Sequence, residues 1–190
     1  MAKVIGIGNE SFQEIRENDC FYIDKTSFIK EWWENMDKST LITRPRRFGK
    51  TLNMNMLECF FSNKYKDRGD LFEGLDIWKE GQYRELQGTY PVIFISFAKI
   101  KQNNYTDTIA GIKRIICDVI QKYYFLKDWQ GLTDEEKNNL KSITYGMDDV
   151  TAQEAIASIS NYLSRYYGKK VIILLDEYDT PMQEAYVNGY

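Results

Sequence analysis

The sequence predicts an α/β fold in which a mostly parallel sheet is flanked by helices, and three observations support this. Two apolar runs, residues 91–97 and 171–175, have the length and composition of buried strands. The segments around them carry apolar residues at helical spacing. Strands that alternate with helices favour a parallel sheet with right-handed crossovers. With 190 residues, the chain is long enough for one domain with its own hydrophobic core.

The individual helices are predicted from capping residues and apolar spacing. Capping boxes are expected at Ser11, Thr133 and Thr151, each with a glutamate three residues later. Gly168 is predicted to end the helix that follows Thr151. The interval 98–170 is helical in pattern throughout, and we interpret it as an elaborated crossover. The helices expected from spacing cover residues 12–18, 26–36, 105–126 and the stretch that follows residue 51.

Composition restricts the available chemistry. The chain has no histidine, which excludes Ser-His-Asp and Cys-His catalysis and most transition-metal sites. Carboxylates, lysines, arginines and Mg²⁺ remain, and phosphoryl transfer requires only these. The three cysteines are scattered, which indicates buried thiols in a reducing cytosol rather than a disulfide framework. We therefore expect a cytoplasmic protein.

Charge and hydropathy argue against two classes of partner. The net charge of −3 gives no overall attraction to nucleic acid. No stretch approaches the ~20 apolar residues of a membrane span, and the N-terminus, MAKVIGIG, is too short and too weakly apolar for a signal peptide. Neither a nucleic-acid nor a membrane partner is expected for this domain, and the oligomeric state is open.

Residues 39–51, STLITRPRRFGKT, follow the pattern of a phosphate-binding loop. A short apolar strand over residues 41–43 is predicted to lead into a tight basic loop, and Gly49, Lys50 and Thr51 open the next helix. Such a helix points its positive N-terminal end at an anion. Lys50 is then expected to contact the β/γ-phosphates, and the Thr51 hydroxyl to bind Mg²⁺.

The loop departs from the usual pattern at its first position. Arg44 stands where G-x-x-x-x-G-K-[ST] has a glycine, and its Cβ disfavours the positive φ that glycine allows. Pro45 removes one backbone N–H. We therefore expect fewer amide donors than in a standard loop, and weaker nucleotide binding that the arginines partly compensate.

A second motif, VIILLDEYD at residues 171–179, has the form of a Walker B strand. Its apolar run suits a strand buried on both faces, and it ends in Asp176 and Glu177, at the sheet edge where ligands bind in open α/β folds. Asp176 is predicted to hold Mg²⁺, directly or through water. Glu177 is predicted to orient and deprotonate the attacking water. The alternative is a strand that simply ends in a polar turn.

Together the two motifs predict a P-loop NTPase-like three-layer sandwich that binds ATP and Mg²⁺. Lys50 and Glu177 are the predicted catalytic residues, and Thr51 and Asp176 the predicted metal ligands. The predicted nucleotide-binding residues are Arg44, Pro45, Arg46, Arg47, Phe48, Gly49, Lys50, Thr51 and Leu52.

The motifs RPRRFGKT, FYIDKT and LLDEYDTP resemble those of the bacterial predicted AAA-ATPase (AAA-ATPase-like) family, and the similarity covers nearly the whole chain. In that family an arginine-rich loop replaces the first Walker A glycine, so Arg44 conforms. The resemblance implies a single N-terminal portion of a P-loop domain: a helical lead-in over 1–38 and a core over 39–190. It also implies ATP rather than GTP.

The resemblance carries three further expectations. Members continue into further strands and often into a C-terminal domain similar to PD-(D/E)xK nucleases, so this chain is expected to be a fragment, incomplete at its C-terminus. A later strand is expected to separate the strands at 41–43 and 171–175, leaving a gap between them unless they close up. Residues 21–26 are a candidate wall for the adenine base, with core packing of their aromatics as the alternative.

Two questions stay open at this stage. Arg44, Arg46 and Arg47 could neutralise the triphosphate, grip a nucleic-acid backbone, or pair with acids such as Asp176 and Asp179; a single cluster in an acidic chain favours phosphate or carboxylate. The function could be Mg²⁺-dependent ATP hydrolysis coupled to an unknown partner or C-terminal domain, or a non-hydrolysing nucleotide-binding switch. Glu177 favours hydrolysis, whereas the altered loop and the missing strand favour the switch.

Overall fold

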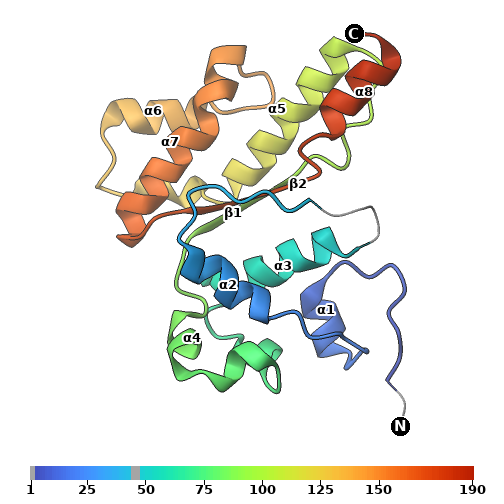
Figure 1. Ribbon diagram of the computed structural model, residues 1–190. Helices are drawn as coiled ribbons and strands as arrows, with labels where there is room; N and C mark the ends of the chain where they lie inside the picture. Colours follow the sequence, from blue (N-terminus) through green and yellow to red (C-terminus); the bar gives the residue numbers. More distant parts are fainter. Residues whose placement is uncertain (1–2, 44–47) are drawn as a thin grey trace. The chain divides into compact units, whose positions relative to one another are not determined.

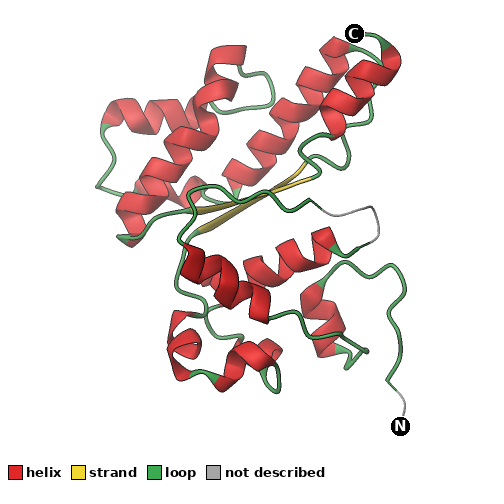
Figure 2. Cartoon of the chain, in the orientation of Figure 1, coloured by secondary structure: helices red, strands yellow, loops and turns green. Residues whose placement is uncertain are grey.

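The computed structural model describes residues 3–43 and 48–190. The chain divides into two compact units, Met1–Val92 and Ile93–Tyr190, and each is described by itself. Helices dominate both units (Figure 2). Within the described ranges the one sheet has two neighbouring strands, β1 (Val92–Ser96) and β2 (Ile172–Asp176). No helix in these ranges is long and apolar enough to cross a membrane.

The first unit is helical and has an aromatic core. Phe12 stacks on Phe72 with ring centroids 5.1 Å apart, and Phe60 meets Phe72 edge to face at 5.2 Å. All three side chains are fully buried, and such ring pairs contribute about 0.5–1.5 kcal/mol beyond the burial of their area. The elements of this unit are α1 (Phe12–Glu17), α2 (Ser27–Asn35), α3 (Lys50–Phe61), η1 (Asn63–Tyr65), η2 (Gly69–Phe72), η3 (Asp76–Lys79) and α4 (Gly81–Leu86) (Figure 1).

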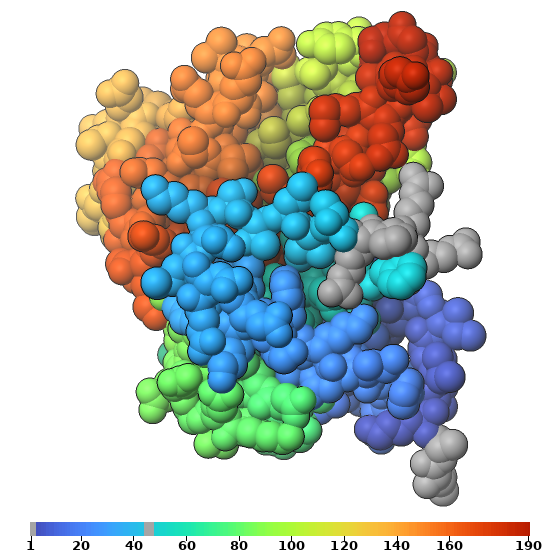
Figure 3. All heavy atoms as spheres, in the orientation of Figure 1, coloured from blue at the N-terminus to red at the C-terminus, as the bar shows by residue number. Residues whose placement is uncertain are grey.

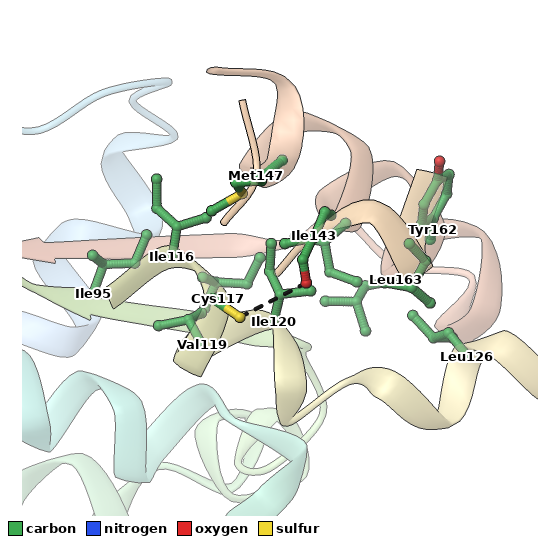
Figure 4. Close-up of a cluster of buried hydrophobic side chains, with 14 of the residues drawn as sticks. Ile95, Ile116, Cys117, Val119, Ile120, Leu126, Ile143, Met147, Tyr162 and Leu163 are labelled. Atoms are coloured by element: carbon green, nitrogen blue, oxygen red, sulfur yellow. Dashed lines mark hydrogen bonds between the residues drawn. The ribbon is translucent and has the colours of Figure 1, made fainter. Parts of the chain in front are cut away.

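The second unit contains the sheet and an aliphatic core. Ile93 and Ile95 of β1 belong to one buried cluster with Ile120 and Leu163, which come from two helices of the crossover (Figure 4). In the same cluster the Cys117 thiol donates to the carbonyl of Ile143 at 3.7 Å. The remaining elements are α5 (Tyr105–Gln121), η4 (Tyr124–Asp128), α6 (Asp134–Ser142), α7 (Asp149–Tyr167) and α8 (Thr180–Asn188). The α/β class, with a small parallel sheet flanked by helices, is confirmed; the three-layer sandwich stays a prediction.

Most helix boundaries follow the predicted caps. Thr133 and Glu136 form the expected capping box at the start of α6, and Gly168 ends α7 with a φ of 64°. The cap predicted at Thr151 is wrong: Asp148 caps α7 by accepting from the Thr151 N–H at 2.7 Å, so the helix begins three residues earlier. The helix predicted over 105–126 ends at Gln121, where η4 takes over.

The strand predicted over residues 41–43 does not form. These residues have no regular secondary structure, and the Leu41 side chain is 63% exposed. In the space-filling view the segment leading up to residue 43, in light blue, lies at the surface of the face shown (Figure 3). A strand needs a neighbour for its N–H and C=O groups, and the two-stranded sheet does not include this segment. The gap predicted between strands at 41–43 and 171–175 therefore does not arise, because the first of these two strands is not formed.

The predicted burial of β2 on both faces is also wrong. Leu174 and Asp176 point to one face and are 5% exposed, whereas Ile173 and Leu175 point to the other and are 43% and 46% exposed. The apolar run has the composition of a strand covered on both faces.

Candidate functional site

The chain enters α3 through a left-handed glycine, at the place where the sequence predicts that a helix begins. Gly49 is the N-cap, in the left-handed conformation with φ 72° and ψ 31°. Glycine adopts this conformation without the steric cost that a Cβ brings. The first helical hydrogen bond runs from the Asn53 N–H to the Gly49 carbonyl at 2.9 Å. The sequence therefore forms its Gly-Lys-Thr turn at the predicted place.

The first turn of α3 leaves backbone donors available. Among the described residues no side chain caps this N-terminus, so the N–H groups of Lys50, Thr51 and Leu52 have no side-chain acceptor from the cap position. They form the positive end of the helix dipole, a place that favours anions. Lys50, Thr51 and Leu52 are all partly exposed, and Phe48 is 58% exposed.

The other predicted loop residues lie outside the described part of the chain. Arg44, Pro45, Arg46 and Arg47 were expected to contribute to nucleotide binding, and the structure describes none of them. The three interpretations of the arginines stay predictions for this reason.

A turn just before α2 is fixed by a carboxylate network in the first unit. Oδ1 of Asp24 accepts from the Thr26 N–H at 2.8 Å and from the Thr26 hydroxyl at 2.7 Å, and Oδ2 accepts from the Asp76 N–H at 2.7 Å. The buried Thr26 hydroxyl also accepts from the Ile77 N–H at 3.1 Å. Burial raises the pKa of Asp24, but these hydrogen bonds outweigh it and the net pKa is lowered.

A pocket of about 260 Å³ opens beside this turn. The start of α2 and the first turn of α3 both line this pocket, and α3 contributes Asn53. Residues 21–26 were predicted as an adenine wall, and only part of that segment lines the pocket. Tyr22 instead packs edge to face on Phe12 at 5.3 Å, so core packing applies to this ring. The lining residues are Asp24, Lys25, Ser27, Phe28, Glu31, Ile42 and Asn53.

The carboxylate pair lies at the end of β2, in the second unit. Asp176 is buried, and its carbonyl accepts from the Phe97 N–H at 3.0 Å, which continues the pairing of β1 with β2. Glu177 follows with a φ of 50°, a left-handed conformation that costs a residue with a Cβ about 1–2 kcal/mol. The turn into α8 is closed by the Thr180 N–H, which donates to the Glu177 carbonyl at 3.1 Å. No residue pattern around Glu177 predicts this backbone conformation.

The predicted metal ligands have suitable chemistry. Mg²⁺ prefers oxygen donors and is often held by one or two protein groups together with substrate phosphates and water. The Thr51 hydroxyl and the Asp176 carboxylate are donors of this kind. Among the residues that the structure describes, no group of three or more His, Cys, Asp or Glu side chains could hold a metal ion. Lys50 and Thr51 belong to the first unit and Asp176 and Glu177 to the second.

Comparison with known proteins agrees with these motifs. The family described as predicted AAA-ATPase (AAA-ATPase-like) matches residues 6–189. A protein of Azotobacter chroococcum mcd 1, described as an uncharacterized protein in the vnfD 5' region, is 30% identical over 185 residues, which cover 95% of this chain and 30% of that protein. The chain thus spans less than a third of its relative's length. No solved structure matches. The family match extends over almost the entire sequence, and the chain therefore belongs to the predicted AAA-ATPase family.

Proposed function

We propose that this chain is an ATP-binding domain that hydrolyses ATP with Mg²⁺. The observation that carries the proposal is the start of α3, where a left-handed Gly49 precedes Lys50 and a first helical turn without a side-chain cap. Family membership supports the same conclusion, since the family is one of predicted AAA-ATPases.

In this proposal each motif has a defined role. The amides of the first turn of α3 and the Lys50 ammonium would bind the phosphates, and Thr51 and Asp176 are the residues that would hold Mg²⁺. Mg²⁺ held there would supply positive charge that stabilises the negative charge developing on the phosphate oxygens during transfer. Lys50 adds positive charge at the same oxygens, which lowers the barrier as the bond to the leaving ADP breaks.

Glu177 is the proposed general base. Its carboxylate accepts a proton from a water molecule, the water oxygen forms a bond to the γ-phosphorus, and the bond from phosphorus to the ADP oxygen breaks. The products are ADP and phosphate, and the proton is released from Glu177 afterwards. Its left-handed backbone supports the assignment, because a strained conformation at a non-glycine residue is typical of functional sites.

A second function, a nucleotide-binding switch without hydrolysis, is the alternative. It is favoured by the loop sequence, in which Arg44 and Pro45 replace residues that would supply a flexible, amide-rich loop. The chain covers 30% of its relative, which supports coupling to a further domain, nuclease-like or otherwise, in a longer protein. Nucleic acid and membrane are not proposed as partners of this domain, which we place in the cytoplasm.

Binding of a fluorescent ATP analogue tests the proposal. We expect Lys50→Met to weaken binding by about 10–100-fold, the usual effect of losing a hydrogen bond to a charged group. Lys30→Met is the matched control, because the Lys30 ammonium pairs with Glu80 at 2.9 Å rather than with a ligand. Equal affinity of the wild type and Lys50→Met, or no binding by the wild type, would refute the proposal.

A further inference from the structure

The turn before α2 brings a second lysine to the start of α3. A Cβ built on Gly49 would lie 3.9 Å from the Nζ of Lys25, so this ammonium lies against the N-cap of the helix. Lys25 is 25 positions away from Lys50 in the sequence; it lies in the segment 21–26 that was a candidate adenine wall, but it was not predicted to bind phosphate. The fold of the first unit alone places it there.

The backbone that carries Lys25 is held on both sides. Its neighbours Asp24 and Thr26 are joined to each other and to the N–H groups of Asp76 and Ile77 by four hydrogen bonds. Thr26 is fully buried. A lysine on a fixed turn loses less conformational freedom on binding than one on a mobile loop.

Asp24 and Glu31 line the same pocket as Lys25, but no ion pair among the described residues engages the Lys25 ammonium. Two neighbouring lysines have carboxylate partners: Lys30 pairs with Glu80 at 2.9 Å and Lys79 with Asp76 at 2.5 Å. Among the described residues Lys25 forms no such ion pair, and the Asp24 carboxylate is engaged by three donors. A cation beside the positive end of a helix is unfavourable unless an anion lies between them.

We propose that Lys25 is a further phosphate-binding residue of the nucleotide site. The inference rests on the proposed function, since the anion is the phosphate chain of the nucleotide that Lys50 binds. Lys25 also lines the pocket that reaches Asn53 in the first turn of α3. In this proposal the phosphate chain is contacted by two lysines that are 25 positions apart in the sequence, together with the amides of α3.

Binding assays on four proteins test this role. Lys25→Met is compared with the wild type, Lys25→Arg and the control Lys30→Met, with a fluorescent ATP analogue as probe and tripolyphosphate as competitor. We expect Lys25→Met to weaken both the analogue and tripolyphosphate by about tenfold or more, because a charge-assisted hydrogen bond is lost. Lys25→Arg should keep most of the affinity, and Lys30→Met should bind as the wild type does.

A protection experiment keeps the inference testable if a variant fails to fold. Lysines of the wild type are acylated with and without ATP, and each site is quantified by mass spectrometry. Protection of Lys25 and Lys50 but not Lys30 is the expected result. If ATP protects Lys50 but leaves Lys25 reactive, or if a folded Lys25→Met binds normally while Lys50→Met does not, the inference is overturned and the proposed function stands. Absence of ATP binding by the wild type would overturn both.

Discussion

Two left-handed residues mark the two motifs of this protein, and they differ in residue type. Gly49 has a φ of 72° where the chain enters α3, and Glu177 has a φ of 50° where it leaves β2. At Gly49 the backbone alone explains the residue, since glycine adopts this conformation at no steric cost. At Glu177 the left-handed backbone disfavours any residue with a Cβ. A role of the glutamate side chain must therefore explain why this residue occurs here.

The contacts of the Glu177 side chain with other described residues do not give it a clear structural role. The Thr180 hydroxyl donates to its Oε2 at 3.4 Å, which is long for a hydrogen bond between oxygens. Elsewhere in the described ranges, the non-glycine residues with positive φ are Asp19 and Met36, which lie just beyond the ends of α1 and α2, where left-handed residues are common. Glu177 alone among them follows a strand. The comparison suggests that one turn is shaped by its geometry and the other by the chemistry of its carboxylate.

The largest effect expected from this comparison is on catalysis. Glu177→Gln keeps the size and the backbone of the residue but removes the base, and we expect phosphate release to fall about 10²–10⁴-fold. ATP affinity and unfolding free energy should stay close to those of the wild type. Phosphate release by the wild type, Glu177→Gln and Glu184→Gln, a control on α8, checks this. If Glu177→Gln still hydrolysed ATP, Glu177 would not be the base. The left-handed conformation of Glu177 could then not be explained by catalysis.

The next effect concerns the turn that supports the Gly49 side. Asp24→Ala removes the acceptor for three hydrogen bonds and leaves the N–H of the buried Thr26 unsatisfied. We expect a loss of about 2 kcal/mol in unfolding free energy, measured by chemical denaturation at pH 7. ATP affinity should fall as well, because the turn carries Lys25. A variant as stable as the wild type would show that the turn is held by packing instead.

The pH dependence of unfolding provides the control for Asp24. Its folded-state pKa is lowered from the ordinary value of 3.8, so its contribution to stability is complete above that value and is lost as the pH falls through the folded pKa. The difference in unfolding free energy between the wild type and Asp24→Ala should therefore narrow below about pH 4. A difference that is the same at pH 7 and pH 3 would exclude the ionised carboxylate as its source.

A smaller effect is expected from a Cβ at Gly49. Among the described residues the nearest side-chain atom would be the Lys25 Nζ at 3.9 Å, an ordinary contact, so the strain expected in Gly49→Ala comes from its φ. We expect a loss of about 1–2 kcal/mol and weaker ATP binding. Gly74→Ala is the matched control: its φ is 78° and its Cβ meets nothing within 4 Å, so it should lose similar stability with unchanged ATP affinity. If Gly49→Ala and Gly74→Ala bound ATP with equal affinity, the Gly49 turn would have no role in nucleotide binding.

Local signals explain what the sequence could predict. The Gly-Lys-Thr turn, the capping box at Thr133 and the two strands β1 and β2 each depend on a few adjacent residues, and the structure confirms them. The cap at Thr151 failed because Asp148 stands three residues earlier and satisfies the same helix end. A local pattern cannot choose between two competent caps.

Features that depend on distant parts of the chain could not be predicted. Residues 41–43 carry a strand-like sequence, but a strand needs a neighbour, and β2 pairs with β1 instead. Lys25 approaches Gly49 only because the turn before α2 is tied to residues 76 and 77. The left-handed backbone of Glu177 has no signature in its residue type. Sequence motifs were thus sufficient to propose candidate residues such as Lys50 and Glu177. The contacts and backbone conformations around them could be described only from the three-dimensional structure.

The smallest expected change in unfolding free energy, that of Glu177→Gly, gives the most direct test of the contrast between Gly49 and Glu177. Glu177→Gly relieves about 1–2 kcal/mol of left-handed strain, and the added freedom of glycine in the unfolded chain offsets about 0.5–1 kcal/mol of it. We therefore expect Glu177→Gly to be as stable as the wild type or slightly more stable by chemical denaturation, although hydrolysis is lost. This is the opposite of Gly49→Ala, which loses stability. If Glu177→Gly were destabilised as strongly as Gly49→Ala, the Glu177 side chain would be holding the fold together, and its conformation would no longer point to catalysis.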